Sequence, residues 1–354
     1  MKRLSCLVLV VVSCFLAVPS SFAQSFVLDL PRGSQHAVVM QRIGITDITV
    51  DYHRPLVNKR KVWGSLVPYG QVWRAGANEN TVIEFADAVT IEGKPLEKGR
   101  YGLHMIPGEN EWTVIFSKNS TSWGSFTYKE AEDALRITVK PQPSEFHEAL
   151  TYDFDDVTPD ATTVTLRWEK LAVPFKVGVA SNDIVQASLQ KQLRGLAQYS
   201  WMGWDDAANY LLQNKIALDQ ALSDTDRSIQ VESRFDNLMT KANVLQAMGR
   251  NDDAKPIIAQ ALAKADPVQM HSYGRQLQIA GKQDEAFKIY QDNAKKNPDT
   301  WIIHVGLARM YSAQGKYPDA SKEMAAAVAG APEPQKAPLQ AMGKRLDNKE
   351  DINK

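Results

Sequence analysis

Cysteine is nearly absent from this sequence of 354 residues. Its two cysteines, Cys6 and Cys14, both lie in an apolar N-terminal segment that is typical of a cleavable leader. Once the leader is removed, we expect a mature chain without a thiol, a disulfide or a cysteine-based metal site. This composition suits an oxidising compartment, and it excludes cysteine nucleophiles and zinc centres built on cysteine.

An excess of either charge is also missing. The chain has 41 basic and 41 acidic residues, and removing Lys2 and Arg3 with the leader leaves 39 basic residues against 41 acidic ones. A protein that binds nucleic acid needs a clear basic surplus to neutralise phosphates. The composition therefore predicts no nucleic-acid partner.

Long hydrophobic runs are confined to the N-terminus. Leu4–Val18 is an apolar run of 15 residues, shorter than the roughly 20 that a membrane-spanning helix requires. Lys2 and Arg3 precede it, Pro19 follows it, and Ala23 offers a small residue to a signal peptidase. We predict a signal peptide over residues 1–23, a periplasmic or secreted protein, and no membrane span.

A second interpretation of the leader stays open. Val11-Val12-Ser13-Cys14 loosely resembles a lipoprotein box, in which Cys14 would carry the lipid. Cleavage after Ala23 is favoured because the apolar run continues beyond Cys14.

Motifs for catalysis and cofactor binding are missing too. The sequence has no Gly-x-Ser-x-Gly elbow, no glycine-rich phosphate loop and no His-x-x-x-His pair. The acidic pair Asp155-Asp156 stands beside a turn, which favours a solvated surface over a glycosidase site. We therefore predict no cofactor and no metal, and the sequence identifies no catalytic residue.

The first half of the mature chain alternates apolar and polar residues with a period of two. Ile48, Val50 and Tyr52 alternate with Thr49 and Asp51. Six further runs follow the same rule, and they are centred on residues 83–85, 101–105, 112–116, 135–139, 164–168 and 173–177. Short strands with tight turns between them predict an all-β domain over residues 24–180, an antiparallel β-sandwich or barrel.

Two predicted connections are long for such a fold, His53–Asn80 and Ser117–Ala134. Connections of this length in a compact domain are usually functional. Their tryptophans, among them Trp63, Trp73 and Trp123, either close the open ends of the domain or face a ligand. The sequence leaves both possibilities open.

The first of these connections also contains the strongest polar cluster. Arginine supplies a planar donor fork for carboxylate or phosphate, and tryptophan can stack on a sugar ring. We predict a small or carbohydrate-like ligand bound by Arg54, Arg60, Trp73, Arg74, Asn78 and Glu79. The alternative is an internal salt bridge from Arg74 to Glu79 or Glu84 that fixes the loop.

The second half changes to a helical period and repeats itself. A glycine followed five residues later by alanine occurs at Gly203, Gly249, Gly281 and Gly315, and the last three lie 32 and 34 residues apart. Pro267, Pro298 and Pro332 are expected to end each unit. This pattern is similar to the tetratricopeptide repeat family over residues 184–332, followed by a terminal helix and tail over residues 333–354. Stacked repeats build extended binding surfaces, so we expect a protein partner.

The strand-rich half resembles a family of exported bacterial proteins known only as domain of unknown function 2911, over about residues 28–178. The resemblance is carried by Asp51–Pro55, Arg60–Gly64, Leu66–Gly70, Val72–Thr81, Gly99–Leu103, Ile106–Pro107, Glu111–Thr113, Trp123–Gly124 and Trp168–Glu169. It implies export and helical repeats behind the β domain, but no activity. The family pattern has a small residue in place of His53 and an aromatic one in place of His104, which counts against a metal site on these histidines.

Three functional hypotheses remain. In the first, an exported non-enzymatic protein binds a small ligand through its β domain and a protein through its repeats. In the second, a hydrolase uses Glu79 as base and Arg74 as anion clamp. In the third, both halves are purely a scaffold.

Overall fold

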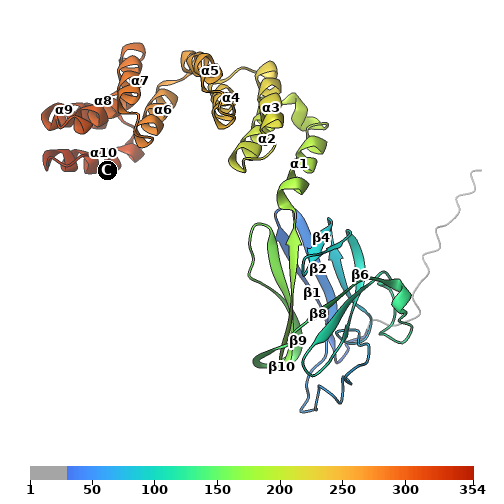
Figure 1. The fold of residues 1–354 in the computed structure, drawn as a ribbon. Coiled ribbons are helices and arrows are strands. Elements are labelled where there is room, and N and C mark those ends of the chain that lie inside the picture. The colour runs from blue at the N-terminus through green and yellow to red at the C-terminus, as the bar shows by residue number, and fades with distance from the viewer. Residues whose placement is uncertain (1–29) are drawn as a thin grey trace, which may run out of the picture. The chain divides into compact units, whose positions relative to one another are not determined.

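The computed structural model describes residues 30–354, which divide into two compact units between Val179 and Ala180 (Figure 1). The predicted leader, with Cys6 and Cys14, lies outside the described residues. Among residues 30–354, no helix combines the length and the apolar character needed to cross a membrane.

The first unit contains, within its described residues, two antiparallel β-sheets. The six-stranded sheet has the order β1 (Gln35–Ile43), β2 (Thr46–Arg54), β3 (Thr81–Phe85), β6 (Gly99–Ile106), β7 (Trp112–Ser117), β8 (Asp133–Val139). The four-stranded sheet has the order β5 (Lys94–Leu96), β4 (Val89–Ile91), β10 (Ala161–Val179), β9 (Gln142–Asp155). The predicted antiparallel all-β fold is confirmed. The barrel alternative is wrong, because the two sheets do not close on each other.

Side chains of the predicted alternation form the core between the two sheets. Ile48 and Val50 of β2 are fully buried, as the period of two requires. Phe116 of β7 packs edge-on against Phe175 of β10, with ring centroids 5.7 Å apart. Tyr52 and Tyr152 make a similar contact at 4.8 Å, so aromatic pairs connect the sheets.

Two long connections leave the six-stranded sheet as predicted. Residues 55–80 join β2 to β3, and residues 118–132, with a short 3-10 turn at Glu130–Glu132, join β7 to β8. Trp63 of the first connection is buried against Trp73, Trp112 and Trp168, with centroid distances of 5.9, 5.0 and 5.6 Å. Trp63 therefore closes the domain, whereas Trp123 of the second connection remains 55% exposed.

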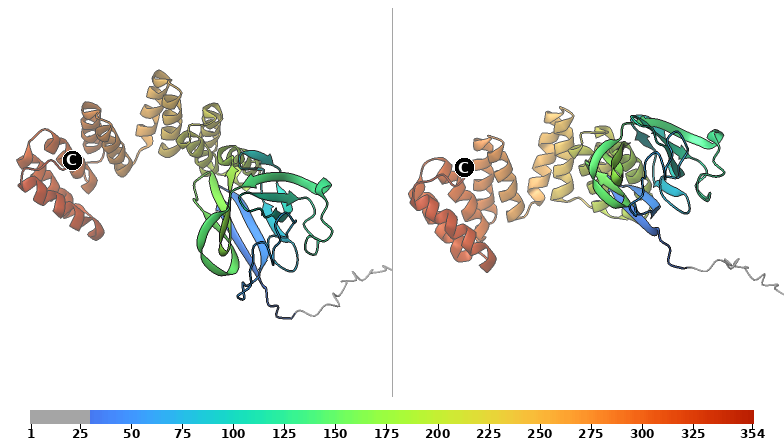
Figure 2. Two further views of the ribbon diagram at one scale, coloured as in Figure 1. Left: turned by 60° about the horizontal axis from the view of Figure 1, so that its bottom comes forward. Right: turned by 90° about the horizontal axis from the view of Figure 1, so that it is seen from below.

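The second unit is helical over all of its residues that are assigned to regular structure. Its elements are α1 (Ser181–Gln192), a short 3-10 turn (Leu196–Tyr199), α2 (Trp201–Gln213), α3 (Leu218–Val231), α4 (Phe235–Ala247), α5 (Asn251–Lys264), α6 (Pro267–Ile279), α7 (Gln283–Lys296), α8 (Trp301–Ala313), α9 (Tyr317–Gly330) and α10 (Glu333–Asp347). From α2 to α9 they pack as successive hairpin pairs (Figure 2). The predicted helical solenoid is confirmed.

The last three copies of the glycine–alanine repeat mark the turn and the crossing of the paired helices. Gly249, Gly281 and Gly315 adopt φ values of 78°, 78° and 71° in the turns between paired helices. This left-handed conformation favours glycine, which explains its recurrence. The alanines that follow at positions 254, 286 and 320 are completely buried where the second helix crosses the first.

Two details of the predicted repeats are wrong. Gly203 lies inside α2, and the turn of the first pair falls at residues 214–217, where Lys215 adopts φ 55°. Pro267 is the first residue of α6 and not the end of α5, a position that proline tolerates because its missing N–H is not needed there.

Candidate functional site

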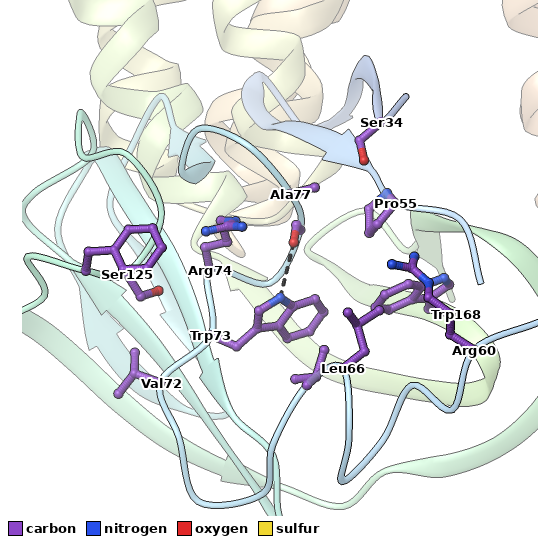
Figure 3. Close-up of a pocket in the computed structure, with 13 residues that line it drawn as sticks. Ser34, Pro55, Arg60, Leu66, Val72, Trp73, Arg74, Ala77, Ser125 and Trp168 are labelled. Carbon is purple, nitrogen blue, oxygen red and sulfur yellow. Dashed lines mark hydrogen bonds between the residues drawn. The ribbon is translucent and has the colours of Figure 1, made fainter. Parts of the chain in front are cut away.

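A pocket of about 370 Å³ opens in the strand-rich unit between the two long connections (Figure 3). Its lining comes from Ser34, from residues between 55 and 77, from Ser125 and Phe126 of the second connection, and from Trp168 of β10. Of the six predicted site residues, Arg60, Trp73 and Arg74 line this pocket.

Trp73 is fixed in the middle of the pocket. Its main chain exchanges two hydrogen bonds with Met105 of β6, both 2.8 Å long. Its indole Nε1 donates to the carbonyl oxygen of Gly76 at 3.1 Å, and its ring stacks on Trp168 with centroids 6.0 Å apart (Figure 3). The pocket thus has a rigid aromatic surface.

Arg74 stands beside this surface without a polar partner. Within residues 30–354 its guanidinium makes no hydrogen bond or ion pair, and its Nε is buried and unsatisfied. The guanidinium carbon lies 6.0 Å from the ring centroid of Phe126, and burial lowers the pKa of Arg74. The half-buried guanidinium can therefore donate hydrogen bonds to an anionic group.

The predicted alternative, a salt bridge from Arg74 to Glu79 or Glu84, is wrong. Glu84 is paired with Arg100 across neighbouring strands at 2.8 Å. Glu79 is paired with Arg32 at 2.6 Å. Arg32 precedes the first strand, and no pattern in the sequence connected it to the loop.

The other two predicted arginines hold the main chain in place. Arg54 Nε donates to the carbonyl oxygen of Leu150 at 3.0 Å, and this bond connects β2 to β9. Arg60 donates to the carbonyl oxygens of Leu56 and Val57 at 2.5 and 3.1 Å. Both guanidiniums already have acceptors, which distinguishes them from Arg74.

Glu79 lines a second depression, of about 460 Å³, together with Arg32, His36 and His53. Its carboxylate lies 3.5 Å from His53 Nε2. Burial raises the pKa of Glu79, but the hydrogen bonds from Arg32 and from its own backbone and the charge of His53 outweigh this effect and leave the pKa below its ordinary value. Glu79 is therefore a weak base.

Asn78 lines neither depression but contacts a residue that lines both. Its side-chain nitrogen donates to the carbonyl oxygen of Ser34 at 3.3 Å, and Ser34 lines both depressions. The six predicted residues are thus divided: three line the first pocket, Glu79 lines the second, and Asn78 and Arg54 line neither.

Ser125 and His104 were not predicted as pocket residues. Ser125 lines the first pocket, and its Oγ lies 2.9 Å from Nδ1 of the buried His104 on β6. Burial lowers the pKa of His104 to about 4. The only signal in the sequence was the unusual length of the connection that carries Ser125.

Metal-ligating side chains do not gather in the part of the chain that the structure describes, where no three His, Cys, Asp or Glu residues are placed to hold an ion. The second depression does contain side chains of metal-ligating types, His36, His53 and Glu79, but they are not placed together to hold an ion.

The fold and the pocket define a class: a two-sheet antiparallel β domain with a ligand-sized pocket, followed by paired helices. Residues 34–177 match the model of a protein family of unknown function (DUF2911). The match covers most of the strand-rich unit and none of the helical unit. None of the curated proteins matches the chain.

Solved structures of tetratricopeptide proteins resemble the helical part. YrrB, described as a TPR protein with an unusual peptide-binding site, is 16% identical, with 47% of this chain and 86% of YrrB covered and a TM-score of 0.29. Yeast Tom70 is 14% identical with a TM-score of 0.27, and the match covers 46% of this chain and 43% of Tom70.

Proposed function

We propose that this is an exported binding protein whose β domain holds a small anionic ligand, of the sugar-acid type, and whose helical unit docks a protein. One observation carries the ligand proposal: Arg74 is half-buried in a pocket and has no polar partner among the described residues. The apolar run Leu4–Val18 and the small residue Ala23 support export. An intact N-terminal methionine on the native protein would contradict export.

An unpaired, partly buried guanidinium costs free energy that a bound carboxylate or phosphate would recover. Its planar fork matches both anions through two parallel hydrogen bonds. The half-buried indole of Trp73 lies in the same pocket, backed by the buried Trp168, and offers a flat apolar face, which suits the apolar side of a sugar ring. A sugar acid combines both features in one molecule.

The hydrolase hypothesis has less support. Arg74 and Glu79, its proposed anion clamp and base, line different depressions. Burial raises the pKa of Glu79, but Arg32 and the other partners of the carboxylate lower it further, so that the pKa lies below its ordinary value. A general base works best with a pKa near the working pH, so Glu79 is poorly suited to the role.

Substitution of Arg74 distinguishes ligand binding from structural support. We expect Arg74→Met to abolish binding of glucuronate, measured by titration calorimetry against glucose as the neutral counterpart. The same change should raise the free energy of unfolding by about 1 kcal/mol, because it removes an unsatisfied buried polar group.

The matched control is Arg60→Met in the same loop. It removes the hydrogen bonds to Leu56 and Val57, so we expect it to lower the free energy of unfolding by about 1 kcal/mol. If Arg74→Met destabilises the protein as Arg60→Met does, Arg74 is a structural residue and the ligand proposal fails.

A further inference from the structure

Strand β1 forms one edge of the six-stranded sheet and is hydrogen-bonded along one side only. It pairs with β2 over its whole length, Gln35–Ile43, without a register shift. Within residues 30–354, no main-chain hydrogen bond joins it to any segment other than β2. The preceding residues are held elsewhere, since Arg32 binds Glu79 and the carbonyl oxygen of Ser34 accepts from Asn78. The outer side of β1 is therefore open to a further strand.

The pairing of β2 shows which main-chain groups of β1 point outward. The carbonyl oxygen of Asp47 accepts from the N–H of Ala86 at 3.0 Å, so the main chain of Asp47 faces β3. Its partner on β1, Arg42, must then direct its own N–H and C=O away from the sheet. Because this direction alternates along a strand, every second residue of β1 from 36 to 42 does the same.

The three other edge strands of the described sheets carry features that discourage further pairing. Strand β5 has three residues, one of which is Pro95. Strand β9 contains Pro143 and pairs with β10 through two register shifts. Strand β8 begins with Asp133 and carries Arg136 in its middle. Shortness, proline, bulges and charge are how natural proteins protect an edge, and β1 has only Arg42 near one end.

The sequence of β1 is complementary to itself in the antiparallel direction. A two-fold axis at Val39 would pair Val38 with Met40 of a second copy, and His36 with Arg42. Each pair joins two positions whose main-chain groups point outward, so about eight hydrogen bonds would form. Val38 and Met40 are 53% and 57% exposed, and the pairing would bring the four side chains of the two copies together on one face.

Charge does not oppose this pairing. Arg42 and the His36 that it would face each have a carboxylate partner of their own. Arg42 binds Asp47 and His36 binds Asp51, both at 2.7 Å. The strand itself contains no acidic residue, so no two carboxylates would meet across the axis.

We propose that the chain associates as a two-fold dimer in which the β1 strands of two copies pair antiparallel about Val39. The two six-stranded sheets then continue into one another. A single strand pair buries little surface, so the dimer is weak, with a dissociation constant of the order of 10–100 µM. The inference is independent of the proposed ligand and of the helical unit.

The dimer also extends the second depression. Gln35 and His36 line that depression. In the paired register they lie opposite Ile43 and Arg42 of the partner subunit, and the side chains of His36 and Arg42 share one face of the joined sheet. The partner subunit therefore supplies part of the wall beside His36.

Sedimentation equilibrium of residues 24–354, from about 5 to about 500 µM, tests the proposal, because this range brackets the expected constant. We expect the wild-type chain to change from monomer to dimer across it. Met40→Lys places a charge in the row of apolar side chains and should weaken association about ten-fold or more. Phe146→Lys, at a 53% exposed apolar residue on the edge strand β9, is the matched control and should associate as the wild type does.

Crosslinking tests the register. Residues 24–354 contain no cysteine, so Val39→Cys introduces a single thiol. At the axis the two Cα atoms should lie about 4.5 Å apart, within the range of a disulfide, and oxidised glutathione should give a covalent dimer. Gln41→Cys, on the same face of the same strand, is the matched control and should not crosslink, because its partner is Ala37.

A wild-type chain that stays monomeric at the highest concentration overturns the proposal. Binding of a peptide with the sequence of residues 35–43 to that monomer would then assign the edge to a strand of another protein. A dimer that Met40→Lys leaves intact lies elsewhere on the molecule and overturns the proposal as well. Should Met40→Lys fail to fold, crosslinking decides the matter, and equal crosslinking of Val39→Cys and Gln41→Cys rejects the pairing.

Discussion

His104 is a basic side chain that β6 places in the interior of the strand-rich unit, where it is 2% exposed. Burial lowers its pKa from 6.5 to about 4, although the charge of Asp133 acts in the opposite direction. Between pH 6.5 and about pH 4, His104 is therefore protonated in the unfolded chain but neutral in the folded chain. As far as His104 determines it, the free energy of unfolding is highest above pH 6.5 and decreases as the pH falls toward 4.

We expect His104→Gln to remove most of this pH dependence. Between pH 7 and pH 5 the free energy of unfolding of the wild-type protein should fall by about 2 kcal/mol because of His104, and that of the variant should not. Urea unfolding followed by tryptophan fluorescence at both pH values measures the difference. Comparison with the wild type cancels the contribution of His271, which is buried in the other unit. Ser125→Ala keeps the titrating group and should keep the loss, and an unchanged loss in His104→Gln would show that His104 is not its source.

The candidate site could be predicted from the sequence only in part. Clustered arginines and tryptophans pointed to the connection over residues 55–80, and residues between 55 and 77 contribute to the lining of the pocket. Their individual roles depend on distant acceptors: Arg54 donates to Leu150, 96 residues away, and Glu79 binds Arg32, 47 residues away. Without these pairings the sequence could not show that, of the three predicted arginines, only Arg74 makes no hydrogen bond or ion pair within residues 30–354.

At the scale of helices and strands, the close approach of paired helices depends on small residues. The hydrogen-sized side chain of Gly274 in α6 faces Tyr290 of α7, and an added Cβ would lie 2.6 Å from the tyrosine ring. Tyr290 is itself 1% exposed and donates to Gln278, so the ring cannot easily move away.

Two glycine-to-alanine substitutions in helices should therefore have opposite effects. We expect Gly274→Ala to lower the free energy of unfolding by about 1–3 kcal/mol, because it overpacks the contact with Tyr290. Gly343→Ala in α10 meets only Met324 Cγ at 3.7 Å, an ordinary contact, and should raise the free energy by about 0.5–1 kcal/mol. Thermal unfolding followed by circular dichroism compares them, and equal effects would contradict the packing argument.

Elements with a strong period were predictable, and those without one were not. Strand β2 alternates buried and partly exposed residues because one face packs in the core, whereas β6 and β7 alternate in sequence but are buried on both faces over most of their length. Strand β9 gave no such signal, since its Phe146 is 53% exposed and its burial pattern is irregular. The first helical turn was misplaced because Lys215, and not glycine, takes the left-handed conformation there.

At the scale of the whole molecule, the chain changes from strands to helices within two residues. Val179, the last residue of β10, pairs with Val89, so the four-stranded sheet is complete before the helical unit begins. Helix α1 follows directly and has no buried residue. The hydrophobic clusters of the helical unit involve only residues after 180. Each unit thus has its own core, which is the physical requirement for independent folding.

A fragment of residues 24–179 should therefore fold without the helical unit. We expect it to be soluble and to unfold in urea in one cooperative transition, because cutting after Val179 removes no strand pairing. The matched control is a fragment ending at Glu169. It loses Val173, Phe175 and Val177, which are at most 1% exposed, and the pairing of β10 with β4, so it should fail to fold. If residues 24–179 show no cooperative transition, the β domain depends on the helices and the division at residue 180 is not a domain boundary.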